Sequence, residues 1–330
     1  MSDDQRKKTA PGIQDLCAAA QRIAPHVHRT PVATCAGIDL LAGVRLFFKC
    51  ENLQKVGAFK ARGATNAVLS LTDAAVRRGV ATHSSGNHAA ALARAAALRG
   101  VPAHIVMPRT APRVKRAAVA GYGAQITECE PTLAARESAL ADVVERTGAT
   151  VIHPYDDPVV IAGQGTAALE LLQEVPDLDA LIAPVGGGGL LSGTVIAAAS
   201  HRRPVAVFGA EPRGADDAFR SLRDGVVYPS VQPRTIADGL LTSLSALTFS
   251  ILYGRVEGIL TVSEGGIVEA MRLVWQRAKL VVEPSGAVPF AAVLENADRF
   301  HDLRVGIVLS GGNVDLDDLP WCRSEPRSRA

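Results

Sequence analysis

The feature that most constrains the fold of this chain is an alternation, from Arg45 onward, of short β-rich runs with longer alanine-rich runs. The short runs have the length and composition of strands, and the long runs space their apolar residues as helices do. Such alternation favours parallel sheets with helices on both faces. We therefore expect an α/β fold built from twisted, mostly parallel sheets.

The expected elements follow one another with little space between them. The predicted strands are 45–52, 79–85, 103–108, 124–130, 150–155, 178–185, 204–211 and 304–310. The predicted helices are 60–71, 86–100, one from Ala111, one from Thr132, 167–175, one after Gly189 and one over 267–278.

Length and charge limit the functional class. At 330 residues the chain can form two domains or one large α/β unit. Its formal net charge of +2 is too balanced for a protein that coats phosphate backbones, so we expect no nucleic-acid partner. No apolar run reaches the roughly 20 residues of a membrane helix, and no apolar signal segment follows MSDDQRKKTA. We expect a cytoplasmic protein with no membrane partner.

Lys60, in the stretch GAFKARGATNA, is a candidate for chemistry. The chain has only seven lysines among its 35 lysine and arginine residues, so its ordinary surface cation is arginine. An amine can lose its proton and attack a carbonyl, whereas a guanidinium cannot. Phe59 could stack on a flat ring held beside that amine. The alternative is an ordinary surface lysine.

A run of four glycines, Gly186, Gly187, Gly188 and Gly189, separates a predicted strand from a helix that we expect to begin near Leu190. Residues without Cβ let successive backbone N–H groups converge on an anion, with the positive end of a helix behind them. This pattern predicts a phosphate-binding loop. The alternative is a flexible turn.

Two further strand ends carry polar residues. Ser84, Ser85, Asn87 and His88 surround Gly86 at a helix start, where hydroxyl, amide and backbone donors suit a carboxylate; a plain N-cap explains only part of this run. Ser310 ends the last strand, and the glycines after it permit close approach of a ligand. Ligands bind at this edge of open parallel sheets.

These parts point to one cofactor. A cofactor with an aldehyde, a planar ring and a phosphate would use all four predicted features. These are the amine, the stacking aromatic ring, the phosphate loop and the carboxylate site. Pyridoxal 5'-phosphate has these three groups.

The sequence resembles the fold type II pyridoxal-phosphate enzymes, and within them the serine racemase and serine/threonine dehydratase branch. The resemblance runs from about Ile13 to Trp321, and its motifs are KCENLQKVGAFKARGA, SSGNHA, HPYDDPVVIAGQGT, PVGGGGLLSG, TIADG and LSGGNVD. It implies a two-domain fold like that of the tryptophan synthase β subunit, with a large cofactor domain over 1–72 and 156–330 and a small substrate-closing domain over 73–155. It also implies a homodimer.

The resemblance assigns roles to residues that match the motifs. It implies that Lys60 forms a Schiff base with the cofactor and removes the Cα proton of the substrate, and that Ser85 acts on the opposite face, which brings some racemisation. The implied cofactor-binding residues are Phe59, Lys60, Asn87, Gly186, Gly187, Gly188, Gly189 and Ser310. Among them, Asn87 is implied to form a hydrogen bond with the 3-hydroxyl of the cofactor ring. The implied residues for the substrate carboxylate are Ser84, Ser85, Asn87 and His88. A neutral Ser310 hydroxyl at the pyridine nitrogen favours elimination.

A second site is implied by the segment GAEPRGADDAFRS. It resembles the divalent-cation site of the serine racemase branch, with Glu211, the carbonyl of Ala215 and Asp217 as ligands for magnesium, manganese or calcium. All three groups are hard oxygen donors. The alternative is that Asp216 or Asp217 only caps the following helix.

The resemblance is particularly close to the 3-hydroxyaspartate dehydratases, which form oxaloacetate and ammonia. Arg136 could bind the β-carboxylate of such a substrate in a bidentate contact; otherwise it is a solvated helix arginine. We therefore expect a lyase that dehydrates a 3-hydroxy amino acid, most of all 3-hydroxyaspartate. The alternatives are a serine racemase or an L-serine/L-threonine dehydratase, and more distantly a non-catalytic binding protein for the cofactor or an amino acid.

Overall fold

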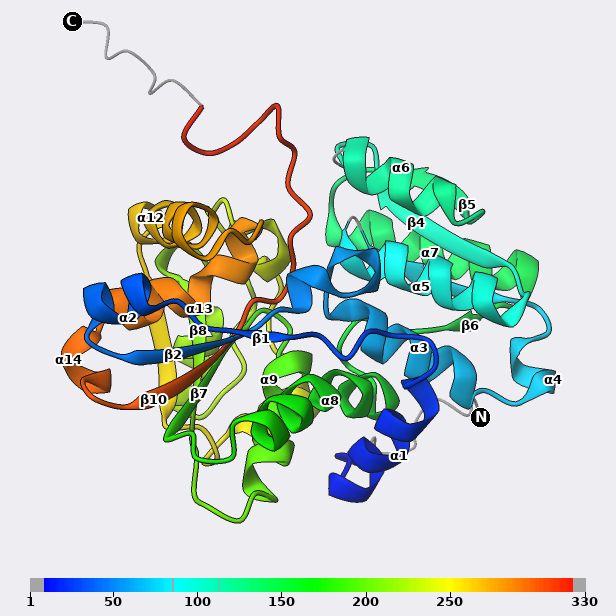
Figure 1. Ribbon diagram of the computed structural model, residues 1–330. Helices are drawn as coiled ribbons and strands as arrows, with labels where there is room; N and C mark the ends of the chain where they lie inside the picture. Colours follow the sequence, from blue (N-terminus) through cyan, green and yellow to red (C-terminus); the bar gives the residue numbers. More distant parts are fainter. Residues whose placement is uncertain (1–8, 85, 112, 323–330) are drawn as a thin grey trace, which may run out of the picture.

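The computed structural model describes residues 9–84, 86–111 and 113–322 and contains two sheets (Figure 1). The larger sheet has the order β1-β2-β10-β7-β8-β9, in which β1 is antiparallel to β2 and all other neighbours are parallel. Its strands are β1 (Val32–Ala33), β2 (Arg45–Lys49), β7 (Ala180–Pro184), β8 (Ala206–Pro212), β9 (Gly258–Val262) and β10 (Arg304–Val308).

The smaller sheet has the order β5-β4-β3-β6, and its neighbours are all parallel. Its strands are β3 (Val80–His83), β4 (Ala103–Pro108), β5 (Gln125–Cys129) and β6 (Thr150–Val151). The prediction of an α/β fold with mostly parallel sheets is confirmed, and each predicted strand has a counterpart.

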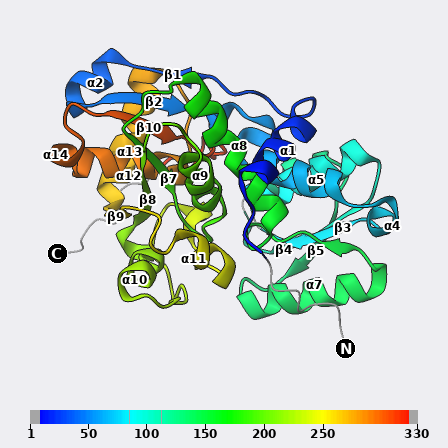
Figure 2. The ribbon, with the colours of Figure 1, turned by 90° about the horizontal axis from the view of Figure 1, so that it is seen from below.

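Helices cover both faces of the larger sheet. Leu181 and Ile182, neighbours in β7, pack into different cores, because successive side chains of a strand point to opposite faces. One core includes α2 (Ala36–Ala42), α12 (Glu264–Leu273) and α13 (Pro284–Glu295); the other includes α1 (Ile13–Ile23), α8 (Pro158–Glu174), α9 (Gly189–Ala199), α10 (Asp217–Asp224) and α11 (Ala246–Leu252). Figure 2 shows these two layers on opposite sides of β7 and β8.

The smaller sheet is covered in the same way. Val80 faces one core and Ala81 the other. The first core includes α3 (Lys60–Ser70), α5 (Asn87–Arg99) and α6 (Arg113–Gly121), and the second includes α7 (Leu133–Thr147). The short elements are α4 (Asp73–Val76), α14 (Ala297–Phe300), η1 (Glu51–Leu53), η2 (Lys55–Gly57), η3 (Arg213–Ala215), η4 (Asp238–Leu240) and the π-helical turn η5 (Val274–Ala278).

Helix α3 lies between the two sheets and packs against both α5 and α8 (Figure 1). Its backbone touches that of α8, since a Cβ added to Gly163 would lie 2.7 Å from the Cα of Gly63. The backbone N–H of Gly63 also donates to Gln164 Oε1 at 3.1 Å. The residues that follow Lys60 are therefore held by both halves of the chain. The expected domain boundaries near residues 72 and 155 stay a prediction.

Some element boundaries differ from expectation. The strand predicted over 150–155 ends at Val151, and the following residues form a loop. The helix predicted from Ala167 begins at Pro158, because Asp157 accepts the backbone N–H of Val159 at 2.7 Å and so caps it. Within the described residues, no helix is both long and apolar enough to cross a membrane.

Candidate active site

Lys60 is the first residue of α3, and segments from three parts of the chain meet there. Its Nζ donates to the carbonyl of Pro154 at 2.9 Å and lies 5.1 Å from the ring centre of Phe59. The backbone N–H of Phe59 in turn donates to the carbonyl of Ser310 at 3.0 Å. Burial lowers the pKa of the Lys60 amine to about 8, because a charged ammonium is poorly solvated there. The amine is thus partly neutral near pH 8.

The first turn of α3 is fixed by a buried group of charges around Arg62. The guanidinium donates to both carboxylate oxygens of Glu51 at 2.8 Å, and to those of Glu170 at 2.7 and 2.8 Å. Lys49 donates to Glu170 at 2.7 Å, so two cations meet two carboxylates. Arg62 is fully buried, and such bidentate pairs are geometrically specific. This group therefore restrains the helix turn that carries Lys60.

The glycine run forms the connection between β7 and α9, as predicted, and α9 begins at Gly189. Gly188 has φ +85°, a conformation that favours glycine. Within the described residues, the buried backbone N–H groups of Gly186, Gly187 and Gly188 donate to no partner. Three free donors at the positive end of an 11-residue helix fit a phosphate group.

Tyr155 lies against this loop. A Cβ added to Gly187 would lie 2.3 Å from the Tyr155 ring, so Gly187 leaves the space that the ring occupies. His153 Nδ1 accepts the backbone N–H groups of Tyr155 at 3.3 Å and Asp156 at 2.8 Å. The segment 153–156 therefore connects the Lys60 amine, through Pro154, with the glycine loop. Its role was not predicted, since the sequence pattern assigned it to a strand.

The predicted carboxylate site lies at the end of β3. Ser84 Oγ accepts the backbone N–H of Gly86 at 3.3 Å. Ser85, the predicted opposite-face acid/base, lies outside the described residues. His88 is buried, its Nε2 lies 3.2 Å from the carbonyl of Ile152, and burial lowers its pKa to about 3. It is therefore neutral at physiological pH and donates to backbone, so it could serve a substrate carboxylate only as a neutral group.

Asn87 connects this loop with the other end of the site. Its Nδ2 donates to Glu283 Oε1 at 2.7 Å, and its Oδ1 accepts from Asn313 Nδ2 at 2.9 Å. Sequence reasoning missed both partners. Asn313 stands in the quoted motif LSGGNVD without a role, and Glu283 precedes Pro284 in a pattern that reads only as a helix start. Ser310 is buried two residues after the end of β10, and its place beside the cofactor ring stays a prediction.

Arg136 lies on α7, where its Nε donates weakly to the carbonyl of Thr132 at 3.4 Å. Burial lowers the pKa of His83, and the positive charge of Arg136 lowers it further, so the two side chains share one electrostatic environment. His83 is the last residue of β3 and directly precedes Ser84. Arg136 is partly exposed, and its helix α7 packs against β3, the strand that leads into the predicted substrate loop.

Glu211 and Asp217, the predicted cation ligands, are both buried. Burial raises the pKa of Glu211 to about 9 and that of Asp217 to about 6. Glu211 accepts the backbone N–H groups of Ala218 at 3.2 Å and Phe219 at 2.6 Å, so this residue caps α10. Asp217 Oδ2 has no hydrogen-bond partner within the described residues.

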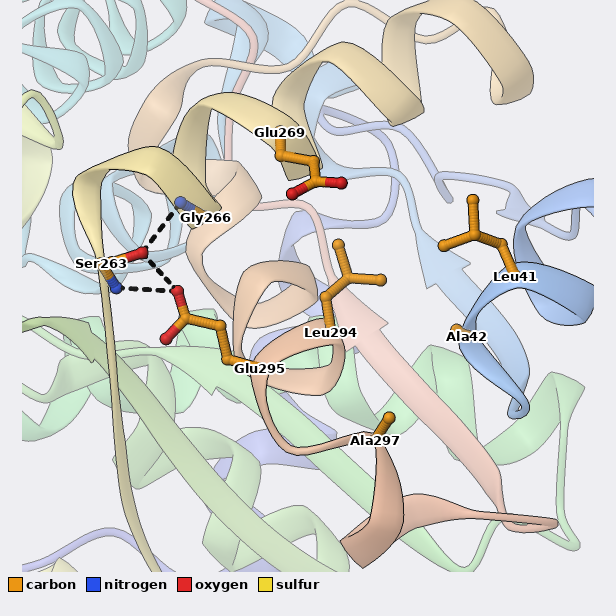
Figure 3. Close-up of a pocket in the computed structure, with 8 residues that line it drawn as sticks. All are labelled: Leu41, Ala42, Ser263, Gly266, Glu269, Leu294, Glu295 and Ala297. Atoms are coloured by element: carbon orange, nitrogen blue, oxygen red, sulfur yellow. Dashed lines mark hydrogen bonds between the residues drawn. The ribbon is translucent and has the colours of Figure 1, made fainter.

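A separate pocket of about 300 Å³ lies between α2, α12 and the end of α13 (Figure 3). Glu295 accepts there from the backbone N–H of Ser263 at 3.0 Å and from its Oγ at 2.5 Å. The pocket shares no lining residue with the Lys60 region or the glycine loop. We assign it no role in the reaction.

The fold and the site fit one class: an α/β enzyme that would hold a phosphorylated carbonyl cofactor against a half-buried lysine. The chain belongs to the family of pyridoxal-phosphate dependent enzymes, whose family model matches residues 23–311. Pyridoxal phosphate is its cofactor, and the cradle of free N–H groups fits it. The fold type II architecture expected from the sequence is confirmed.

Relatives refine this assignment. The chain is 51% identical to the β-hydroxyaspartate dehydratase of Paracoccus denitrificans over 311 residues, which cover 94% of this chain and 99% of that protein. It is 50% identical to the serine racemase of Dictyostelium discoideum over 311 residues, 93% of this chain and 96% of that one. The structure of maize serine racemase matches with a TM-score of 0.91 and 46% identity, over 94% of this chain and 95% of that chain.

Proposed function

We propose that this enzyme dehydrates a 3-hydroxy amino acid to a 2-oxo acid and ammonia, and that its preferred substrate is 3-hydroxyaspartate, which gives oxaloacetate. The observation that carries the substrate assignment is the position of Arg136, a cation near the strand end that leads into Ser84. A substrate with a second carboxylate gives this cation a partner. The name of the Paracoccus denitrificans relative supports the same substrate.

Each residue of the site would have a separate role in the reaction. Bound pyridoxal phosphate supplies an electron sink for the bond between Cα and its hydrogen. Gly186 to Gly189 would hold its phosphate through backbone N–H groups, Phe59 would pack on its ring, and Ser310 would face its ring nitrogen. Lys60 would hold its aldehyde carbon and, once released, accept the Cα proton at Nζ. A lysine whose pKa is about 8 suits that role, because a base works best near the operating pH.

The substrate carboxylate would be held by Ser84, by the Ser85 position and by the backbone N–H of Asn87, whose side chain would contact the ring hydroxyl of the cofactor. His88 would contribute as a neutral imidazole, a role that its lowered pKa supports. A serine at position 85 also supports a second candidate function, serine racemisation, since it would supply a proton donor on the face opposite Lys60. The Dictyostelium discoideum relative carries that name.

A substrate comparison with one pair of variants tests the proposal. We expect purified enzyme to convert at least one of erythro and threo 3-hydroxyaspartate faster than L-serine or L-threonine, measured as oxo-acid formation. Arg136→Ala should lower kcat/KM for 3-hydroxyaspartate about 10- to 100-fold, the value of a charge-assisted contact, and should change serine turnover little.

Arg146→Ala is the matched control, because Arg146 lies on the same helix and makes the same contact to the carbonyl four residues earlier, Asp142, at 3.3 Å. Equal losses on both substrates, or an equal effect of the control, would remove Arg136 from the substrate site. D-serine formation faster than elimination would favour the racemase.

We also propose a divalent-cation site formed by Glu211, the carbonyl of Ala215 and Asp217. It is supported by the unpartnered Asp217 Oδ2 and by two buried carboxylates that a cation would neutralise. Within the described part of the chain, no three His, Cys, Asp or Glu side chains form a metal cluster, so the backbone carbonyl and water must complete the set.

Thermal unfolding tests this site. Magnesium, manganese or calcium added after chelation should raise Tm by roughly 3 °C or more, and Asp217→Asn should abolish the rise. Asp216→Asn is the control, because Asp216 pairs with Arg220 at 2.8 Å and makes no side-chain cap to α10. A Tm that does not respond to any of the three cations would leave only the capping role of Glu211.

We also propose that the enzyme is a homodimer and that it is located in the cytoplasm. A homodimer would cover exposed apolar side chains such as Leu40, which is 87% exposed. The five cysteines are all unpaired, which fits a reducing cytoplasm. Sedimentation at several concentrations tests the dimer.

A further inference from the structure

Glu283 is a buried carboxylate that the proposed reaction does not use. It directly precedes α13, only 2% of it is exposed, and its backbone N–H donates to the carbonyl of Gly311 at 3.0 Å. Its Oε1 accepts from Asn87 Nδ2 at 2.7 Å. A buried carboxylate without a catalytic role is costly, so the contact to Asn87 calls for a reason.

The hydrogen bonds around Asn87 fix which way its amide points. Asn313 Nδ2 donates to the backbone carbonyl of Val56 at 2.7 Å, and a carbonyl can only accept. The same Nδ2 donates to Asn87 at 2.9 Å, so Asn87 must present its oxygen to Asn313. The Asn87 nitrogen then faces Glu283, which as a carboxylate can only accept. A flipped Asn87 would place two oxygens together at Glu283 and two donors together at Asn313.

One N–H of Asn87 is left over. Its Nδ2 carries two hydrogens, and only the bond to Glu283 uses one of them within the described residues. The fixed orientation therefore presents a donor, and never an acceptor, to a group beside Asn87. A donor stabilises an ionised hydroxyl on the cofactor ring over its protonated form.

Glycines before Lys60 and after Ser310 leave room for the side chains of Glu283, Asn87 and Asn313. A Cβ added to Gly311 would lie 2.4 Å from Glu283 Oε1 and 3.1 Å from Asn87 Nδ2. A Cβ added to Gly57 would lie 2.5 Å from Asn313 Oδ1. Glycine at both positions permits the close approach of these side chains.

Burial and two nearby charges set the pKa of Glu283. Burial raises the pKa of Glu283 to about 7, the Lys115 charge lowers it, and the Asp238 charge raises it. Lys115, on α6, forms an ion pair with Asp238 on η4. The Lys115 charge, which lies beside the smaller sheet, favours the ionised form of Glu283. In that form Glu283 only accepts hydrogen bonds, as its contact with the Asn87 amide requires.

We propose that Glu283 is a positioning residue, which acts through Asn87 to present an N–H donor to the ring hydroxyl of the bound cofactor. The inference rests on the proposed contact between Asn87 and that hydroxyl. It is independent of which amino acid the enzyme consumes. Its test therefore uses the holoenzyme without substrate, so that it can fail while the dehydratase proposal stands, and the reverse.

The absorbance of the holoenzyme reports the ionisation of the ring hydroxyl. Glu283→Leu, which removes the acceptor, should shift absorbance from the long-wavelength band to the near-ultraviolet band and move the pH midpoint of that change upward by about one unit. It should also weaken cofactor binding about tenfold. Glu283→Gln can still offer an oxygen to Asn87 and should stay near the wild type in both measurements.

A double variant separates positioning from general damage. If Glu283 acts through Asn87, Glu283→Leu combined with Asn87→Ala should show no larger spectral shift than Asn87→Ala alone. Glu295→Leu is the control, the same substitution at the other end of α13, and it should leave the spectrum unchanged. The proposal would be overturned if Glu283→Leu kept the spectrum and pH midpoint of the wild type. It would also be overturned if the spectral effects of Glu283→Leu and Asn87→Ala were additive in the double variant.

Discussion

At the residue scale, the reactivity of Lys60 comes from its surroundings. Its amine has a backbone carbonyl as its hydrogen-bond partner, and burial alone brings its pKa to about 8 from an ordinary value of 10.5. By contrast, Lys115 has a raised pKa, because the charges of Glu283 and Asp238 outweigh its burial. Two lysines of one chain are thus shifted in opposite directions by the presence or absence of carboxylates.

The lowered pKa of Lys60 predicts how cofactor capture by the apoenzyme depends on pH. Only a neutral amine attacks an aldehyde, so the rate should rise with pH and level off above about 8. Stopped-flow absorbance after mixing apoenzyme with pyridoxal phosphate measures this rate. N-acetyl-lysine under the same conditions corrects for ionisation of the cofactor itself and should keep rising towards its ordinary pKa of about 10.4. A protein rate that follows the model amine would contradict the shift.

At the element scale, the connection from β7 to α9 combines a strand end, a left-handed glycine and a helix N-terminus. A Cβ added to Gly188 would lie 2.7 Å from the side chain of Leu244 and 2.9 Å from that of Thr248. The loop is therefore held from outside by α11 and the turn before it. Backbone donors aimed by such a rigid loop need no reorganisation when a phosphate binds.

Two glycine substitutions separate backbone strain from loss of the phosphate site. Gly100, which ends α5 at φ +69°, would place a new Cβ in open space. Gly100→Ala should cost about 1 kcal/mol of unfolding free energy and leave cofactor affinity unchanged. Gly188→Ala adds clashes to the same strain, so it should cost more and weaken cofactor binding at least tenfold. Denaturant unfolding and cofactor titration measure both, and equal affinities would show that the loop does not hold the phosphate.

At the scale of the whole molecule, the features that could be predicted from the sequence are those that depend on local pattern. Eight strands and the position of the glycine loop between β7 and α9 were predicted correctly, because buried strands and glycine runs carry their signal within a few residues. Strands β1 and β9 were missed: β1 has only two residues, and β9 closely follows the short helix α11, which was not predicted either. The strand predicted over 150–155 was too long, because His153 binds its own following backbone and bends the chain towards Lys60.

The rest of the site could not be predicted from local pattern, because it depends on tertiary contacts. Asn87 and Glu283 are 196 residues apart, and Asn313 and Val56 are 257 apart. Neither Glu283 nor Asn313 lies in a pattern that distinguishes it from a helix start or a loop polar residue. The resemblance to known enzymes assigned the residues that touch the cofactor, whereas the contacts that fix them became visible only in the fold.

The most direct test of the central claim is to locate the lysine that carries the cofactor. Borohydride reduction of the holoenzyme fixes the linkage between amine and aldehyde, and peptide mass spectrometry then distinguishes the seven lysines of the chain. We expect the cofactor mass on the peptide that contains Lys60 and on no other. Its stoichiometric presence on another lysine, or the absence of any labelled peptide from yellow holoenzyme, would contradict the assignment of this site.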